Sequence, residues 1–435
     1  MTWIPPSHLL SHGRPPTHPI AIRGGTPIPF ARFHADVAAT AGRLSTCSQA
    51  ALACDDTYLF TVGLLALLHT GADVTLPPNT QPGTLTGLTI PIVNDALIAT
   101  APTASRHFAP LDPNRGKITF HTSGSTGAPK HVEKTLGILQ RESETLHQTF
   151  GPRLGAGPVH ATVSHQHLYG LAFRLLWPLA AGIPFDADTD AVWETLLPKL
   201  HAGAAIVSSP AHLSRLAGLT PIPPSRAPTL ILSAGAPLST AAARTTETLL
   251  GRLPTEIFGS TETGAIATRQ QRHGDEPWTS LPGSEIRTDS RDRMAVRTPY
   301  VEGWQQTQDV IDPLPTGFRF LGRADRIVKV EGQRISLPAL ESALESLPLV
   351  EQAAVVALPG LPTRLGALLV LTAEGNAQRA TLGPFPFTRH LRRLLSAHLE
   401  PTGLPRLWRI SDALPTRAMG KRNDTAIAAL FEDAP

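Results

Sequence analysis

The segment Thr122-Ser-Gly-Ser-Thr-Gly-Ala-Pro-Lys130 follows directly on a short strand-like run, Lys117 to His121. Its small and hydroxylated residues allow backbone N–H groups to converge on an anion, and the hydroxyls add further hydrogen bonds. The glycines let the backbone approach a phosphate without a clash at Cβ. A Walker loop is excluded, because Lys130 lies between a proline and His131 rather than between glycine and Ser or Thr. The segment therefore predicts a phosphate-binding turn at the end of a strand, with a flexible linker as the alternative.

Strand-like and helix-like segments alternate on both sides of this turn. Before it, the sequence predicts helices at Ala35 to Ala53 and Thr57 to Leu68, and a strand at Asp73 to Leu76. After it, the sequence predicts helices at Asp190 to Leu200 and Ser239 to Leu250, and strands at Ala204 to Ser208 and Thr229 to Ser233. Such alternation favours an α/β fold with largely parallel sheets.

The pattern changes in the last quarter of the chain. A strand-like run at Arg326 to Val330 is followed by an amphipathic helix at Pro338 to Ser346 and a β run at Gln352 to Leu358. We therefore predict two domains. Residues 1–324 would form a large N-terminal domain of mixed, largely parallel sheets flanked by helices, and residues 325–435 a small, mobile α+β C-terminal domain.

Composition and charge exclude several classes of protein. Hydrophobic residues make up 41% and charged residues 17% of the chain, which is typical of a globular protein. Basic residues are spread along the sequence, and aspartates interrupt the densest stretch, from Arg287 to Arg297, so no nucleic-acid surface is expected. The longest apolar run, Leu59 to Leu68, is too short to span a membrane. With no secretory start and only Cys47 and Cys54 as cysteines, a cytoplasmic location is expected.

Four further stretches follow the phosphate turn in the chain: Phe258-Gly-Ser-Thr-Glu-Thr-Gly264, Gln306-Thr-Gln-Asp309, Gly322-Arg-Ala-Asp-Arg-Ile-Val-Lys329 continuing to Gly332-Gln-Arg334, and Leu414-Pro-Thr-Arg-Ala-Met-Gly-Lys421. Together with the turn, and in this order, they resemble the motifs of the adenylate-forming superfamily, which includes acyl- and aryl-CoA synthetases, nonribosomal adenylation domains and luciferases. The resemblance covers residues 122 to 421, about two-thirds of the chain. It implies an ATP-dependent and Mg²⁺-dependent ligase.

The resemblance assigns most of these residues to the nucleotide. Attack of a carboxylate on the α-phosphate of ATP brings anions together, so the site must supply positive charge. Glu262 is suited to hold Mg²⁺, Thr261 to bond an α-phosphate oxygen, and Asp309 with Arg323 to bind the ribose hydroxyls. The remaining nucleotide contacts would come from Thr122, Ser123, Gly124, Ser125, Thr126, Gly127, Lys130, Gly235, Ala236, Phe258, Gly259 and Ser260. Gln308 replaces the glycine that the family has before the ribose aspartate.

The lysines stand out because the chain has only six of them among 38 basic residues, the other 32 being arginine. A compact ammonium such as that of Lys421 can reach both the substrate carboxylate and the α-phosphate. By the resemblance, Asp325 is the hinge about which the small domain rotates, so that Lys329 and the loop at Gly332 replace Lys421 in a second half-reaction. Lys130, Lys329 and Lys421 thus occupy the three motif positions at which the family has lysine.

The segment His165-Gln-His-Leu-Tyr-Gly170 has three interpretations. The two histidines could bind a metal, although no further ligands accompany them, or they could be core histidines. The segment also resembles the family's His-x-x-Gly stretch, which would place His167 near the substrate carboxylate. No acidic residue occurs from Ser164 to Trp177, so a substrate with an α-amine is not expected. The roughly 120 residues before the phosphate turn favour a compact pocket for an aryl or short acyl acid.

These observations predict an acid–thiol ligase. ATP and a carboxylic acid, such as a hydroxybenzoate-like acid, would give an acyl-adenylate and pyrophosphate. The pantetheine thiol of CoA or of an acyl carrier protein would then displace AMP. The alternatives are a medium- or long-chain fatty acyl-AMP or acyl-CoA ligase and, in a different class, a catalytically inactive nucleotide-binding scaffold. A phosphotransferase is disfavoured because the Walker lysine is missing.

Overall fold

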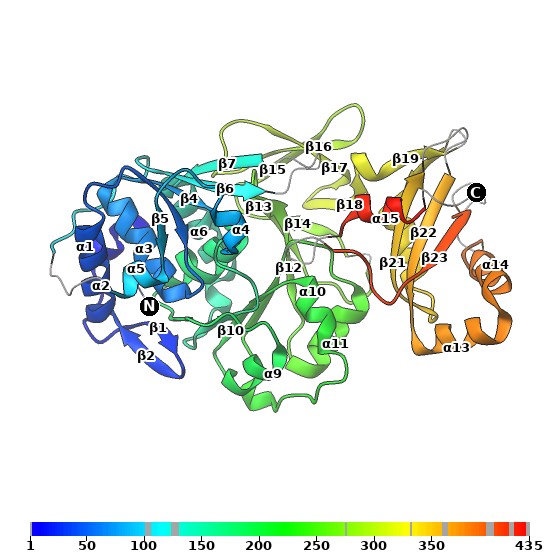
Figure 1. The fold of residues 1–435 in the computed structure, drawn as a ribbon, viewed down its shortest axis with the longest axis horizontal. Helices are drawn as coiled ribbons and strands as arrows, with labels where there is room; N and C mark the ends of the chain where they lie inside the picture. The colour runs from blue at the N-terminus through cyan, green and yellow to red at the C-terminus, as the bar shows by residue number, and fades with distance from the viewer. Residues whose placement is uncertain are drawn as a thin grey trace. The chain divides into compact units, whose positions relative to one another are not determined.

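The computed structural model describes residues 2–100, 106–122, 130–274, 276–330, 333–358, 364–396, 404–416 and 422–431 (Figure 1). The chain divides into two compact units. Unit 1 comprises residues 1–285 and 296–305, and unit 2 comprises residues 286–295 and 306–435. The predicted domain boundary at residue 325 and the hinge at Asp325 stay predictions.

A long mixed sheet forms the centre of unit 1, with strands in the order β14-β13-β12-β11-β10-β8-β9-β1-β2. Their bounds are β1 Pro19–Arg23, β2 Thr26–Pro29, β8 Val159–Ala161, β9 Phe185–Asp186, β10 Ala205–Ser208, β11 Leu230–Ser233, β12 Thr255–Ser260, β13 Gly264–Arg269 and β14 Trp278–Ser280. The strands from β12 to β1 in this order run parallel. Strands β10 and β11 are buried at every position, because a parallel sheet is covered on both faces.

A second sheet of unit 1 has the order β5-β3-β4-β6-β7. Its strands are β3 Gln49–Ala53, β4 Asp73–Leu76, β5 Ile92–Asn94, β6 Lys117–Thr122 and β7 Lys130–Thr135. The strand predicted before the phosphate turn is confirmed as β6, and β7 returns antiparallel to it, with Thr122 opposite Lys130. The helix predicted over residues 35–53 is wrong beyond Arg43. Residues 49–53 lie between two parallel neighbours, so sheet packing outweighs the helix propensity of their alanines.

Helices cover both sheets of unit 1 (Figure 1). The longer ones are α2 Phe30–Arg43, α3 Thr57–Thr70, α6 Leu136–Phe150 and α11 Thr240–Leu250. The shorter helices and helical turns are Pro6–His8, α1 Leu9–His12, α4 Pro82–Leu85, α5 Asp95–Ala99, Gly151–Arg153, α7 Leu168–Gly170, the π-helix Leu171–Leu176, α8 Trp177–Ala181, α9 Trp193–Leu196, Leu197–Lys199, α10 Pro210–Leu213, Ser214–Leu216 and Pro224–Arg226. Helix α3 is almost entirely buried; Asp56 caps its first turn and Gly71 ends it in a left-handed conformation. None of the helices in the described ranges is long and apolar enough to cross a bilayer.

Unit 2 contains most of the strands that follow residue 285. Strands β15 Glu285–Thr288, β16 Arg293–Arg297, β17 Gln305–Leu314 and β18 Gly317–Arg323 are neighbours in that order. They are followed by the turn Ala324–Arg326, the hairpin β19 Ile327–Val330 and β20 Gln333–Ser336, and the sheet of β21 Val350–Leu358, β22 Arg364–Leu371 and β23 Leu407–Ile410. The helices are α12 Leu337–Glu345, α13 Ala373–Leu382, α14 Pro384–Leu395 and α15 Asp424–Ala429. The predicted α/β class, with large mixed sheets and a small C-terminal α/β region, is confirmed.

Candidate functional site

The predicted site residues that follow strands of the long sheet lie at one edge of that sheet. The parallel strands β8, β10, β11 and β12 are adjacent, and their carboxyl ends meet at the same edge. The His165 to Gly170 segment follows β8, Gly235 and Ala236 follow β11, and the Thr-Glu-Thr turn follows β12. This edge is where open α/β sheets bind their ligands. Alternation of strands and helices in the sequence could predict this arrangement.

The turn after β12 presents Thr261 and Glu262 outward. Both the backbone N–H and the hydroxyl of Ser260 lie within hydrogen-bonding distance of Thr263 Oγ1, at 3.1 and 3.0 Å. Thr263 is therefore buried, whereas Thr261 is half-buried and Glu262 is exposed. Gly259 allows the tight approach, because a Cβ there would lie 2.2 Å from the carbonyl oxygen of Gly264. The Glu262 carboxylate is thus accessible to a metal ion.

A buried lysine and glutamate support this turn from beneath. Lys134, which is 4% exposed, donates from Nζ to the carbonyl oxygen of Glu262 at 3.3 Å. Glu142 accepts a hydrogen bond from the backbone N–H of Ala265 at 2.9 Å. Burial lowers the pKa of Lys134, although the negative charges of Glu142 and Glu262 raise it in part. Burial raises the pKa of Glu142, although the positive charge of Lys134 lowers it in part. The sequence analysis missed both residues; the scarcity of lysine was the one signal that could have pointed to Lys134.

The two histidines of the His-x-His pair have different environments. His165 is 2% exposed. Its Nε2–H donates to the carbonyl oxygen of Cys54 at 2.9 Å, and its Nδ1 accepts from the Thr57 hydroxyl at 3.1 Å. Burial lowers its pKa to about 3, so the ring is neutral. Because both ring nitrogens are occupied, the metal-binding interpretation is wrong and His165 is a core histidine.

His167 begins a helical turn whose backbone packs closely against the preceding loop. It is half-buried, and its carbonyl oxygen accepts a hydrogen bond from Leu171 N at 2.8 Å. Gly170 sits so close to the preceding loop that a Cβ would lie 2.0 Å from the carbonyl oxygen of Ser164. Only glycine fits there, which is a physical reason for the glycine of the His-x-x-Gly pattern.

Strand β11 ends with a buried serine, and the segment that follows it becomes exposed. Ser233 is 1% exposed, and its side chain makes no hydrogen bond with any described residue. The buried hydroxyl of Tyr169 lies beside the backbone of Ser208. Gly235 has φ of +96°, a conformation that favours glycine, and both Gly235 and Ala236 are exposed. Phe258, on the neighbouring strand β12, stacks edge-on against Trp278 with ring centres 5.1 Å apart.

The predicted ribose pair lies in unit 2. Asp309 and Arg323 are opposite each other on β17 and β18, and Arg323 Nη1 is 3.8 Å from Asp309 Oδ1. The backbone N–H of Asp309 donates to Thr307 Oγ1 at 3.1 Å. Gln308 lies within β17. In the described part of the chain, Asp292 is the non-glycine residue with positive φ, so the backbone at Gln308 does not adopt the left-handed conformation that favours glycine. The local backbone therefore does not require the family's glycine.

Several predicted residues cannot be placed as side chains. Ser123, Gly124, Ser125, Thr126, Gly127, Gly332 and Lys421 lie outside the described residues. Thr122 ends β6, Lys130 begins β7, and Lys329 lies in β19 opposite Arg334. Their assigned roles stay predictions.

A buried charge cluster in unit 1 has the residue types of a metal site. The possible ligand atoms of His160, Asp186 and Asp190 lie within 4.8 Å of one another. However, the ammonium of Lys199 lies 3.2 Å from Asp186 and 3.1 Å from Asp190. The fully buried guanidinium of Arg174 donates to the backbone oxygens of Val163, Asp186 and Asp188. These cations already neutralise the carboxylates, so we assign the cluster a structural role.

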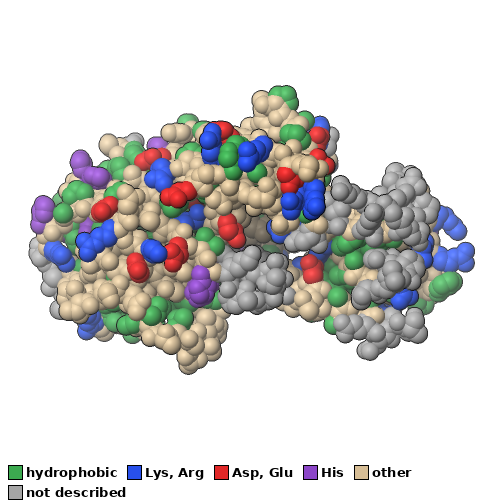
Figure 2. All heavy atoms as spheres, turned by 90° about the horizontal axis from the view of Figure 1, so that it is seen from above, with side chains coloured by type: hydrophobic (Ala, Val, Ile, Leu, Met, Phe, Trp, Pro, Cys, Tyr) green, Lys and Arg blue, Asp and Glu red, His purple; other side chains and the backbone are tan. Residues whose placement is uncertain are grey.

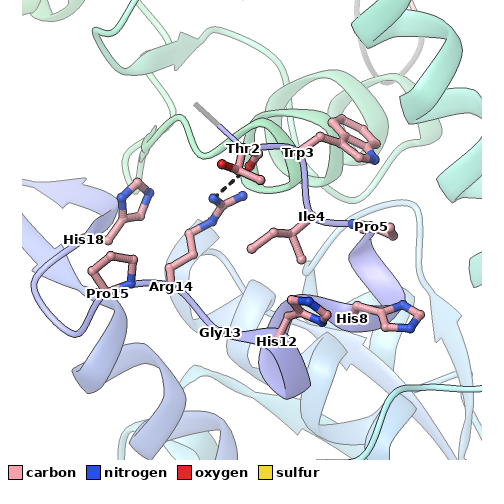
Figure 3. A pocket seen from close by; sticks show the side chains of 10 residues that line it. All are labelled: Thr2, Trp3, Ile4, Pro5, His8, His12, Gly13, Arg14, Pro15 and His18. Carbon is pink, nitrogen blue, oxygen red and sulfur yellow. Dashed lines mark hydrogen bonds between the residues drawn. The ribbon is translucent and has the colours of Figure 1, made fainter.

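A separate pocket of about 700 Å³ lies at the N-terminal segment, where Trp3, Arg14 and three histidines are among the residues that line it (Figure 3). None of the predicted site residues lines it. Arg14 donates to the carbonyl oxygens of Thr2, Leu179 and Ala180, so its charge faces the last carbonyls of α8. This arrangement anchors the N-terminal segment to the unit.

Comparison with known proteins gives one consistent result. The family described as "AMP-binding enzyme" matches residues 78–287, a range that includes the phosphate turn and the Thr-Glu-Thr turn. The chain is 30% identical over 311 residues to a 4-coumarate–CoA ligase of Rhodobacter capsulatus, covering 71% of this chain and 75% of that protein. It is 28% identical over 317 residues to the 4-coumarate–CoA ligase of Cereibacter sphaeroides, covering 71% of each. The fold is similar to ATP-bound MatB from Rhodopseudomonas palustris, with a TM-score of 0.82, 18% identity and 99% of each chain covered.

Proposed function

The chain belongs to the AMP-binding enzyme family as an AMP-forming acid–CoA ligase, and from this premise we propose that its substrate is an aryl acid with a polar ring substituent, such as a hydroxybenzoate. A carboxylate oxygen of the acid attacks the α-phosphorus of ATP, and the bond to the β-phosphate oxygen breaks to release pyrophosphate. A thiolate then attacks the acyl carbon, AMP leaves, and the thiol proton passes to solvent.

The proposal rests on two buried hydroxyls, one of them without a partner. The side chain of Ser233 makes no hydrogen bond within the described residues, although most buried polar groups have one, and the hydroxyl of Tyr169 has only the backbone of Ser208 beside it. Both belong to the carboxyl edge of the long sheet. Ser233 pairs with Ser208 across β10 and β11, and Ser208 Oγ is already bonded to Thr162 at 2.9 Å. A hydroxyl or carbonyl group on the substrate would satisfy Ser233 and could add a second bond to the Tyr169 hydroxyl.

The surroundings of these hydroxyls suit an aromatic ring. Tyr169 and Phe173 have ring centres 4.9 Å apart, and both pack with Val163 in one apolar cluster. Aromatic rings favour such tilted and stacked neighbours. The segment from Ser164 to Trp177 contains no acidic residue that could hold an ammonium group. The relatives named for 4-coumarate, a phenolic acid, give further support.

The catalytic roles follow the predicted residues. We assign Lys421 to the carboxylate and α-phosphate during adenylation, with Thr261 and His167 beside the reacting groups, and Lys329 to thioester formation. Glu262 would hold Mg²⁺, which supplies positive charge to the phosphates. The residue fits this role because its carboxylate is exposed while Lys134 holds its backbone.

Carboxylate-dependent exchange of pyrophosphate into ATP tests the substrate class. The panel should contain 4-hydroxybenzoate, 3-hydroxybenzoate, benzoate, 4-coumarate, octanoate and palmitate. We expect the hydroxylated aryl acids to have the highest kcat/KM. The variant Tyr169→Phe, which keeps the ring, should reduce the preference for hydroxybenzoate over benzoate by about tenfold, the value of one buried hydrogen bond. A preference for palmitate would support the fatty acyl alternative, and no exchange with any acid would support the inactive scaffold.

A further inference from the structure

Helix α14 of unit 2 exposes a face of arginines around one aromatic ring. We call Phe385, Arg389, Arg392 and Arg393 the arginine face; the three arginines lie four, seven and eight residues after Phe385, so all four share one side of the helix, with Arg389 and Arg393 exposed and Arg392 half-buried. Phe385 is 71% exposed, and the guanidinium of Arg389 lies 6.0 Å from its ring centre. Arginine and hydrophobic side chains lie side by side at this end of unit 2 in Figure 2.

The opposite face of α14 is fully engaged in the core of unit 2. Phe387, Leu391 and Leu395 are buried and pack in the same cluster as residues of β21 and β22. The helix is therefore held firmly and its apolar side is not available to a lipid bilayer, which would require that side to insert. The arginine face is left as the side that a partner can reach.

The charge of the arginine face is not balanced locally. No Asp or Glu occurs between Glu374 and Glu400 in the sequence. In addition, none of the three arginines forms an ion pair with an acidic side chain of the described residues. The formal charge of the whole chain is only +3, so this helix carries a local concentration of positive charge. Such a surface attracts an acidic partner through electrostatic complementarity.

We propose that the arginine face docks an acidic acyl carrier protein, whose phosphopantetheine thiol accepts the acyl group from the adenylate. This inference rests on the proposed function. Aromatic residues and arginine are the types enriched in protein–protein interfaces and their energetic centres. CoA presents phosphates, which a small-molecule site holds in a concave pocket, whereas the arginine face is the outer side of a helix. A protein surface therefore matches the observations better than the free cofactor does.

The proposal is tested by comparing two acceptors with the same acyl-adenylate. The variants are Arg389→Glu, Arg393→Glu and the double variant. The control is Arg319→Glu, at an exposed arginine of β18 that is 54% accessible, and it matches each single variant in charge. Each acyl carrier protein of the source organism, in its phosphopantetheinylated form, is assayed beside CoA. We expect the double variant to lose at least about tenfold in kcat/KM for the carrier protein, while pyrophosphate exchange and transfer to CoA stay within about twofold. Raised salt should weaken transfer to the carrier protein in the wild type more than in the variant.

Other outcomes would overturn the docking surface. These are equal carrier-protein kinetics in the wild type and the double variant, equal losses for CoA and carrier protein, or acceptance of CoA with rejection of every carrier protein. A change of oligomeric state in Arg389→Glu would instead assign the face to a second copy of the chain. Loss of binding to phosphatidylserine vesicles with unchanged transfer would assign it to a membrane. Absence of pyrophosphate exchange in the wild type would contradict the proposed function and not the docking surface alone.

Discussion

At the scale of single residues, the environment of a side chain decides its role more than its motif does. His165 and His167 are two positions apart in the sequence, yet His165 is a neutral core residue with both ring nitrogens bonded. The same contrast holds for two lysines that no motif includes. Lys134 supports the turn of the candidate site, and Lys199 lies among three aspartates.

The pKa of His165 gives a prediction for stability against pH. The pKa falls from 6.5 to about 3 on folding, so the unfolded chain binds a proton at higher pH than the folded chain does. The stabilising contribution is therefore present above pH 6.5 and is lost as the pH falls toward 3, with a slope of up to about 1.4 kcal/mol per pH unit.

Urea denaturation between pH 7 and pH 4 measures this slope. The variant His165→Asn should be less stable at pH 7 but should lose less stability on acidification than the wild type. His201→Asn, at an exposed histidine, is the matched control and should keep the wild-type slope. An unchanged slope in His165→Asn would show that other groups govern acid denaturation.

At the scale of elements, glycines set how closely the loops of the candidate site approach one another. A Cβ at Gly170 would lie 2.0 Å from the carbonyl oxygen of Ser164, so Gly170→Ala should displace the backbone that carries His167. We expect a loss of about 1–3 kcal/mol in stability, typical of overpacking, together with a marked fall in adenylation. Thermal unfolding and pyrophosphate exchange measure the two effects. Gly83→Ala, in a helix with no atom within 4 Å of the added methyl group, should leave adenylation at the wild-type level.

Most elements near the motifs could be predicted from the sequence, because they are short apolar runs bounded by turn residues. Strands β6, β10 and β11 and helices α11 and α12 agree with the predicted segments within about two residues. The strand at residues 49–53 could not be predicted, because alanine is a good helix former and only its parallel neighbours select the extended form. Likewise, the support from Lys134 and Glu142 depends on contacts between residues more than 100 positions apart.

At the scale of the whole molecule, the chain divides into two compact units, and two lysines of unit 2 would act in two successive half-reactions. We expect Lys421→Ala to abolish formation of the acyl-adenylate while leaving ATP binding largely intact, because the ammonium acts on the transition state. Lys329→Ala or Gly332→Leu should chiefly impair thioester formation. Pyrophosphate exchange measures the first half-reaction, and transfer from preformed acyl-adenylate measures the second. Equal losses in both half-reactions for every variant would contradict the assignment of Lys421 and Lys329 to different half-reactions.

The charge cluster of unit 1 has a consequence for the dependence of this region on divalent ions. The Lys199 ammonium occupies the position among Asp186, Asp188 and Asp190 that a divalent ion would take in a protein built to depend on one. The counter-charge is covalently part of the chain and arrives with it at synthesis. We therefore expect removal of divalent ions with EDTA to leave the thermal stability of this region unchanged.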